Sequence, residues 1–171
     1  RGRLVIGGRF TLVWYQIPAG SVGQWAGTKW LPLSFGVSVG EEMGVADVMA
    51  LFPYAGGLVA GGGWDHADAQ LANNVAFYDG SIWQPMGAGV DGRVLAFTEY
   101  DGALVVGGEF SAAGGLPAPY IAAWDGINWS NEFTPVAISD LAIAANFDRV
   151  HLSWNVAAEA RSALHGIRVE R

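Results

Sequence analysis

The chain has 171 residues, of which 51% are apolar and only 15% are charged, so it is neither disordered nor fibrous and could form one domain with a sizeable core. With a formal net charge of −7 and no cluster of Lys or Arg, it is not expected to bind nucleic acid or an anionic membrane surface. The absence of cysteine excludes disulfides, thiolate zinc sites and cysteine nucleophiles.

Glycine pairs that follow apolar runs divide the chain into repeats. The 25 glycines favour an all-β chain with many tight turns, and the pairs that begin at Gly61 and Gly107 lie 46 residues apart. Ten of the 26 positions in 58–83 are identical in 104–129. A period in the forties built from short strands is typical of β-propeller blades. We therefore expect a single propeller repeat array, with repeats 1 to 4 at about residues 1–38, 39–86, 87–134 and 135–171 and the last of them degenerate.

Repeat 1 has three strand candidates and matches the repeat pattern less closely than repeats 2 and 3 do. No signal peptide is visible and Arg1 lies inside the first candidate, so we expect a fragment or a processed product. The stretch from Met43 to Trp64 is the nearest approach to a membrane span, but it carries Asp47, Pro53 and several glycines. Its register with the other repeats favours a pair of buried strands instead.

Repeats 2 and 3 offer four strand candidates each. The first is 94–100 in repeat 3, with 48–54 as its counterpart, and its apolar start suits an inner strand covered on both faces. Asp101-Gly102 then predicts a two-residue hairpin, because this pair favours positive φ angles. The second strand is 104–110, whose two glycines remove Cβ where a neighbouring backbone or ring must come close.

A second hairpin completes each repeat after a variable loop, which is 111–119 in repeat 3. The third strand is 120–124 and the fourth runs from 127 to about 132. Aromatic pairs with a spacing of five span this hairpin in three repeats, and we expect the rings to pack between adjacent blades. The repeated motif comprises Gly7, Gly8, Trp25, Trp30, Gly61, Gly62, Tyr78, Asp79, Gly80, Trp83, Gly107, Gly108, Trp124, Asp125, Gly126 and Trp129.

Repeat 4 departs from the pattern. Ser153-Trp154 stands where the double glycine is expected, and 167–170 is its third strand candidate. The strand candidates then number three, four, four and three, or about three and a half blades. Since propellers close with roughly four to eight blades, we expect further blades of the parent chain, or a partner, to cover the open edges.

The motif in 107–115 and 121–129 resembles the tandem propeller repeats of large secreted bacterial proteins, and 87–96 resembles the link between successive repeats. This group is related in pattern to kelch and galactose-oxidase-like propellers. The resemblance implies four-stranded antiparallel blades and a secreted or cell-surface location, but no activity. It does not extend to galactose oxidase chemistry, whose cofactor needs a cysteine-linked tyrosine.

Candidate binding residues lie in the loops between the second and third strands. These loops, and the links between blades, should emerge at one end of the disc, where rigid scaffolds commonly hold variable binding loops. Asp65, His66 and Asp68 could bind a ligand or hold a divalent cation, and the alternative is a polar surface loop.

Two further candidate groups belong to the same end. Trp14, Tyr15 and Gln16 have the ring and amide typical of sugar recognition, unless this loop folds back on the disc. Glu41 and Glu42, in the insertion at 39–45, could make this end acidic or could form a solvated rim.

The sequence favours a non-catalytic binding module that recognises a glycan or a protein. No Ser-His-Asp order, phosphate-binding loop or zinc spacing is visible, so no catalytic residue is assigned and no cofactor is expected beyond a possible divalent cation. The alternatives are the propeller portion of an extracellular oxidoreductase, hydrolase or lyase whose catalytic residues lie outside this chain, and a purely structural spacer.

Overall fold

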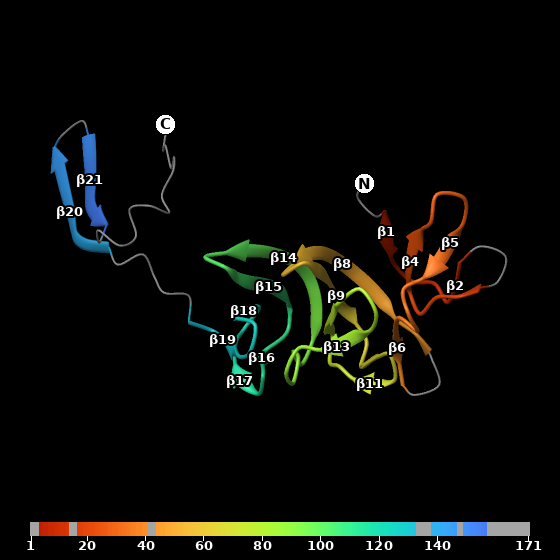
Figure 1. The fold of residues 1–171 in the computed structure, drawn as a ribbon. Coiled ribbons are helices and arrows are strands. Elements are labelled where there is room, and N and C mark those ends of the chain that lie inside the picture. Colours follow the sequence, from red (N-terminus) through yellow and green to blue (C-terminus); the bar gives the residue numbers. More distant parts are fainter. Residues whose placement is uncertain (1–3, 14–16, 41–43, 133–137, 147–148, 157–171) are drawn as a thin grey trace. The chain divides into compact units, whose positions relative to one another are not determined.

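The computed structural model describes residues 4–13, 17–40, 44–132, 138–146 and 149–156, and all regular secondary structure in these residues is β (Figure 1). The chain forms two compact bodies, Arg1–Asn131 and Glu132–Arg171, each of which is described by itself. No helix in the described residues is long and apolar enough to cross a membrane. Residues 47–63 form two paired strands, as the sequence predicts, but the first of them is only partly buried.

Repeats 2 and 3 each form a four-stranded antiparallel sheet in which consecutive strands of the pattern are neighbours. In repeat 2 the strands are β8 (Asp47–Tyr54), β9 (Gly57–Gly63), β12 (Val75–Tyr78) and β13 (Trp83–Pro85). In repeat 3 they are β14 (Arg93–Tyr100), β15 (Ala103–Glu109), β18 (Ile121–Trp124) and β19 (Trp129–Ser130). The four predicted strands are confirmed in both repeats, and these sheets are compatible with propeller blades.

Repeat 1 forms a three-stranded sheet, as predicted. Its strands are β1 (Val5–Gly7), β4 (Val22–Trp25) and β5 (Trp30–Pro32), in the order β1-β4-β5. The second body contains the antiparallel hairpin of β20 (Ile138–Asn146) and β21 (Arg149–Val156). The third strand candidate of repeat 4, at 167–170, lies outside the described residues.

The loops at the ends of these sheets form small sheets of their own. Four short strands make one of them, in the order β11 (Gln70–Leu71), β10 (His66–Ala67), β6 (Val37–Val39) and β7 (Gly44–Val45). Two-stranded ladders join β2 (Leu12–Val13) to β3 (Ile17–Pro18), and β16 (Ala112–Ala113) to β17 (Leu116–Pro117). The predicted variable loop 111–119 is therefore an ordered hairpin.

Tight turns join the first and second strands of repeats 2 and 3. Asp101 and Gly102 have φ angles of 52° and 78°, and Ala55 and Gly56 have 48° and 78°. Each pair separates directly paired residues, so both hairpins have the two-residue geometry that the sequence predicts for Asp-Gly.

The hydrophobic cores lie between successive repeats. We call the core between repeats 1 and 2 seam 1/2 and the core between repeats 2 and 3 seam 2/3. Seam 1/2 consists of Val22, Leu33, Val37, Ala46, Val48, Ala60, Trp64, Ala67, Ala72, Ala76, Tyr78 and Trp83. Seam 2/3 consists of Val59, Val75, Met86, Val90, Val94, Leu104, Val106, Phe110, Ala113, Ala118, Ala122, Trp124 and Trp129.

The two glycines of each pair have different roles. A Cβ on Gly61 would lie 2.5 Å from atoms of Val94 and Phe97 in the next repeat. Gly7 faces the same two positions of repeat 2. A Cβ on Gly62 would instead collide with the Asp47 carbonyl of its own sheet, beside the bulge in β8. The first glycine therefore admits the next repeat, and the second admits a β-bulge, which confirms the predicted close approach.

The aromatic pairs cross their hairpins in all three repeats, and in repeats 2 and 3 a tryptophan of the pair also bonds to the preceding repeat. The ring centroids are 5.4 Å apart in repeat 1, 5.1 Å in repeat 2 and 5.2 Å in repeat 3. The Trp83 indole nitrogen donates to the carbonyl of Leu33 at 2.9 Å, and that of Trp129 donates to the carbonyl of Met86 at 2.7 Å. Both acceptors belong to the preceding repeat, so these tryptophans are structural.

The expectation that the first strand is covered on both faces is wrong in both repeats, since Met49 in β8 is 42% exposed at the equivalent bulge. Val94 is fully buried in β14, whereas Leu95 and Tyr100 are 47% and 45% exposed. The first strand is an edge strand of its sheet, and Leu95 stands at the register shift of a bulge. One face of β14 packs on repeat 2 through Val94 and Phe97, so an apolar run here does not mean burial on both faces.

Candidate functional site

The two ends of the sheets in the first body carry different connections, long loops and links at one end and short hairpin turns at the other. Strand β9 begins at the tight turn after β8 and ends where the loop 64–74 begins. We call the end with this loop and the link 33–46 the loop end, and the end with the hairpin turns the turn end. The link and the loop pair directly, since Ser38 lies opposite His66 and Val37 lies opposite Ala67. The predicted convergence of link and loop at one end is therefore confirmed.

Asp65 joins the loop to the link. Its Oδ1 accepts a hydrogen bond from the Gly40 nitrogen at 2.7 Å and lies 2.8 Å from Nδ1 of His66. The hydrogen bond with His66 is the largest cause that lowers the pKa of Asp65, and partial burial opposes it. The Asp65 side chain is 45% exposed, whereas that of His66 is 14% exposed. Asp65 is thus a half-exposed, ionised acceptor fixed at the loop end.

The Asp68 carboxylate has a structural role. It has a φ angle of 45°, its Oδ1 accepts from the Phe35 nitrogen at 2.8 Å, and its Oδ2 accepts from the Trp83 nitrogen at 2.7 Å. Both carboxylate oxygens therefore accept main-chain hydrogen bonds from residues on two sides of the loop. No group of three or more His, Cys, Asp or Glu that could hold a metal ion occurs in the described residues. The divalent cation at Asp65, His66 and Asp68 stays a prediction.

The other candidate residues lie outside the part of the chain that the structure describes. These are Trp14, Tyr15, Gln16, Glu41 and Glu42. The last described residue before Glu41 is Gly40, whose nitrogen donates to Asp65. The hydrogen bond therefore anchors the start of the insertion beside Asp65.

Phe35 is an exposed aromatic residue at the loop end that the sequence analysis did not select. It is 69% exposed, and its nitrogen is held by Asp68. Aligning 33–37 with 86–90 would have revealed it, because Ala88 takes its place in the next link. Exposure of a phenyl ring to water is unfavourable, and an exposed apolar side chain of this size often marks a binding surface. We therefore add Phe35 to the candidate site.

The hairpin aspartates at the turn end stabilise their turns. Oδ1 of Asp79 accepts from the nitrogens of Ser81 and Ile82, and Asp125 does the same with the two equivalent nitrogens. These hydrogen bonds, above all the one from Ile82, lower the pKa of Asp79. Both carboxylates therefore stabilise the turns of their own hairpins.

A cleft of about 390 Å³ lies at the loop end of repeat 3, lined by Asp91, Glu109, Phe110, Ser111, Pro119 and Tyr120. Its counterpart in repeat 2 is covered by the next link, where the Val90 nitrogen donates to the Asn73 carbonyl. The cleft therefore corresponds to a surface that packs against the next link in repeat 2, and we do not include it in the candidate site.

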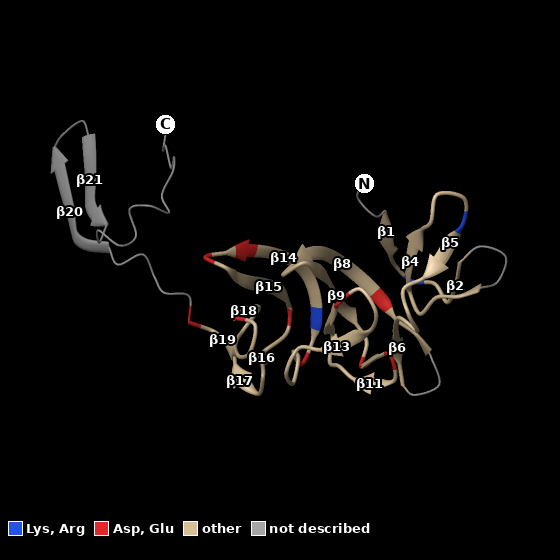
Figure 2. Ribbon diagram, in the orientation of Figure 1, with Lys and Arg blue, Asp and Glu red and all other residues tan. Residues whose placement is uncertain are grey.

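Figure 2 shows few basic segments in the described part of the chain, and they do not gather into one surface.

Comparison of the chain with known protein families, with characterised proteins and with solved structures finds no match. The fold defines the class of protein, an all-β array of repeats with four-stranded antiparallel sheets.

Proposed function

We propose that this chain is a non-catalytic recognition module with propeller-like repeats, part of a secreted or cell-surface protein, which binds a glycan or a protein at its loop end. The secreted setting rests on the resemblance of the repeats to those of secreted bacterial proteins.

One observation carries the proposal: repeats 2 and 3 keep the same loop backbone while its side chains change. Strands β10–β11 and β16–β17 pair in the same way, and the positive φ angles of Asp68 and Ala69 recur at Gly114 and Gly115. A fixed backbone that presents different side chains is the usual arrangement of a binding surface on a rigid scaffold.

The side chains of repeat 2 fit recognition. Asp65 offers a half-exposed carboxylate, which accepts hydrogen bonds from hydroxyl or amide groups. Phe35 offers a phenyl face for a sugar ring or for an apolar side chain. The oxygens of Asp68 already accept main-chain hydrogen bonds, which suits a carboxylate that fixes shape rather than one that transfers protons.

The test is a glycan array and a protein pull-down with the full chain and a loop-swap variant. The swap gives repeat 2 the residues of repeat 3 through Phe35→Ala, Asp65→Ser and His66→Ala. We expect binding to fall by about tenfold or more, because truncated contact residues at a binding centre have effects of this size. Asp65→Ser also removes the acceptor of the Gly40 nitrogen, so the melting temperature should fall modestly, and binding is compared at a temperature where both proteins are folded.

Asp79→Asn at the turn end is the matched control and should leave binding unchanged. Equal binding by the loop-swap variant would reject the proposed surface. Binding of neither a glycan nor a protein, or turnover of a substrate without stable binding, would reject the proposed function.

A further inference from the structure

The four short strands at the loop end of repeat 2 form a sheet with one face on the core. We call it the loop sheet, and its strand order is β11-β10-β6-β7. Val37 and Ala67 lie opposite each other on its inner face and are buried in seam 1/2. Since successive residues of a strand point to opposite faces, their neighbours in these strands point away from the core. The loop sheet therefore has an outer face as well.

One residue from each strand contributes to a row across this outer face. Leu71 lies opposite His66, His66 lies opposite Ser38, and Ser38 lies opposite Val45. Directly opposite residues of antiparallel strands share a face, so these four residues, which we call the outer row, span about 14 Å. Leu71 and Val45, at the two ends, are 65% and 43% exposed. A sheet face in contact with water usually carries polar side chains, so this pair of exposed aliphatic side chains marks a contact surface.

The polar groups at the centre of the outer row are already hydrogen-bonded within the protein. Nδ1 of His66 lies 2.8 Å from Oδ1 of Asp65, and the Ser38 hydroxyl donates to the Gly40 carbonyl at 3.3 Å. A sugar needs several polar partners for its hydroxyl groups and a flat ring on which to stack. Branched aliphatic side chains provide neither. The outer row is therefore better suited to the apolar side chains of a protein than to a glycan.

The charge of repeat 2 indicates what else a partner must carry. No Lys or Arg lies between Lys29 and Arg93 (Figure 2), whereas the same stretch contains Glu41, Glu42, Asp47, Asp65, Asp68, Asp79 and Asp91. The hydrogen bond with His66 is the first cause that lowers the pKa of Asp65, so this half-exposed carboxylate is ionised at neutral pH. No Lys or Arg pairs with it among the described residues. A complementary partner therefore supplies the cation.

Repeat 2 has this surface and repeat 3 does not. Ala112 and Pro117 take the places of His66 and Leu71 in the loop of repeat 3. The small sheet there has only strands β16 and β17 in the part of the chain that the structure describes, with no counterpart of β7 and its Val45. Strand β7 belongs to the insertion at 39–45, so the insertion widens the outer face in repeat 2 alone.

We propose that the outer row, with Asp65 beside it, is a docking surface for a protein segment in which Lys or Arg adjoins aliphatic side chains. The aliphatic side chains of the segment pack on Leu71 and Val45, and its cation pairs with Asp65. Burial of apolar area supplies most of the affinity, and the ion pair sets the orientation. This inference rests on the proposed function and selects a protein from the two classes of ligand named there.

The probe is a random dodecapeptide library displayed on phage and selected against the full chain. We expect the enriched peptides to carry Lys or Arg next to Leu, Ile or Val. An enriched peptide is then labelled with fluorescein and titrated by fluorescence anisotropy. Its affinity should fall by about tenfold or more for a Leu71→Thr/Val45→Thr variant, because both changes remove central apolar contacts. Both residues are exposed and threonine suits a strand, so the melting temperature should change little.

Asp65→Asn tests the ion pair separately. Asparagine keeps a side-chain oxygen that accepts from the Gly40 nitrogen, but it removes the charge. We expect affinity to fall by about threefold and the loss of affinity at high salt to become smaller. A purely structural role of Asp65 would leave the salt dependence unchanged. Leu116→Thr is the matched control, because Leu116 is an equally apolar side chain, 53% exposed, in the small sheet of repeat 3. It should leave binding unchanged.

The inference is overturned if no peptide is enriched, if the enriched peptides lack a cation beside aliphatic residues, or if the Leu71→Thr/Val45→Thr variant binds equally. A glycan that binds the full chain and not the loop-swap variant would leave the proposed function standing and overturn only the choice of a protein. A peptide that the loop-swap variant binds as tightly as the full chain would reject the proposed surface at the loop end, and with it the inference.

Discussion

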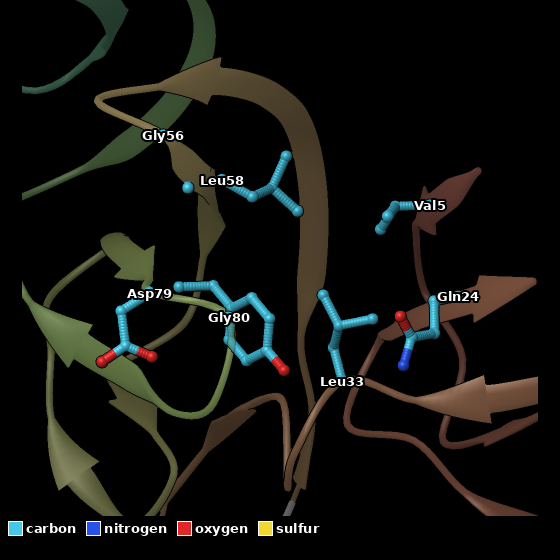
Figure 3. Close-up of a pocket in the computed structure, with 9 residues that line it drawn as sticks. Val5, Gln24, Leu33, Gly56, Leu58, Asp79 and Gly80 are labelled. Carbon is cyan, nitrogen blue, oxygen red and sulfur yellow. The ribbon is translucent and has the colours of Figure 1, made fainter. Parts of the chain in front are cut away.

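Seams 1/2 and 2/3 share one backbone plan but are filled differently. Both have a glycine that admits the next repeat, and both have an indole nitrogen that donates to a carbonyl of the preceding repeat. Phe77, which lies opposite Val59 in seam 2/3, is replaced by Gln24 opposite Val5 in seam 1/2, where a cavity of about 350 Å³ remains (Figure 3). The conserved plan shows that the repeated motif encodes the docking of one repeat on the next. The difference shows that complete filling depends on residues outside the motif.

The largest expected effect concerns the glycine that admits the next repeat. In Gly61→Ala the new Cβ would meet Val94 and Phe97 at 2.5 Å, so seam 2/3 must open. We expect a loss of about 3 kcal/mol in the free energy of unfolding, the usual range for an overpacked core. Urea denaturation of the full chain measures this loss.

Gly63→Ala is the matched control in the same strand. The nearest atoms to its new Cβ belong to the Arg93 side chain, at 3.4 Å, which is an ordinary contact. The change in stability should stay within about 0.5 kcal/mol. Equal losses at both glycines would show that the effect comes from the strand and not from the seam.

A smaller loss of stability is expected from the replacement of a buried tryptophan, and its size should depend on whether the indole nitrogen donates a hydrogen bond. Trp129→Phe removes the hydrogen bond from the indole nitrogen to the Met86 carbonyl, which keeps its hydrogen bond from the Gly89 nitrogen, so the loss should be about 0.5–1.5 kcal/mol. Trp64 is 3% exposed, but its indole nitrogen has no hydrogen-bond partner among the described residues, and Phe110 takes its place in repeat 3. Trp64→Phe should therefore cost much less than Trp129→Phe. A larger loss at Trp64 in thermal unfolding would show that volume, not the hydrogen bond, dominates.

The repeating part of the fold can be predicted from sequence because its signals are local and occur more than once. Asp101-Gly102 specifies its turn within two residues, and the aromatic pairs face each other across a hairpin of known length. Burial is harder to predict, since it depends on what lies beside a strand. Leu95 has the same apolar side chain that a core position would need, yet a bulge places it in solvent.

The candidate site could be predicted only in part. The sequence placed Asp65 and Asp68 in one loop and predicted that the loop meets the link. It could not show that Asp68 is held by the nitrogens of Phe35 and Trp83, because these contacts join residues 33 and 15 positions apart. The cavity beside Gln24 could not be predicted either, because it depends on which side chains pack around this position and no sequence motif marks it.

The smallest expected effect is a reciprocal exchange in the first hairpins of repeats 2 and 3. Ala55 and Asp101 hold the same positive φ position, at 48° and 52°. Alanine pays about 1–2 kcal/mol in this region because its Cβ crowds the following carbonyl, and aspartate tolerates it better. Ala55→Asp should therefore raise the free energy of unfolding by about 0.5–1 kcal/mol, and Asp101→Ala should lower it by a similar amount. Changes of the same sign in urea denaturation would mean that side-chain contacts, not the turn backbone, decide the stability of these hairpins.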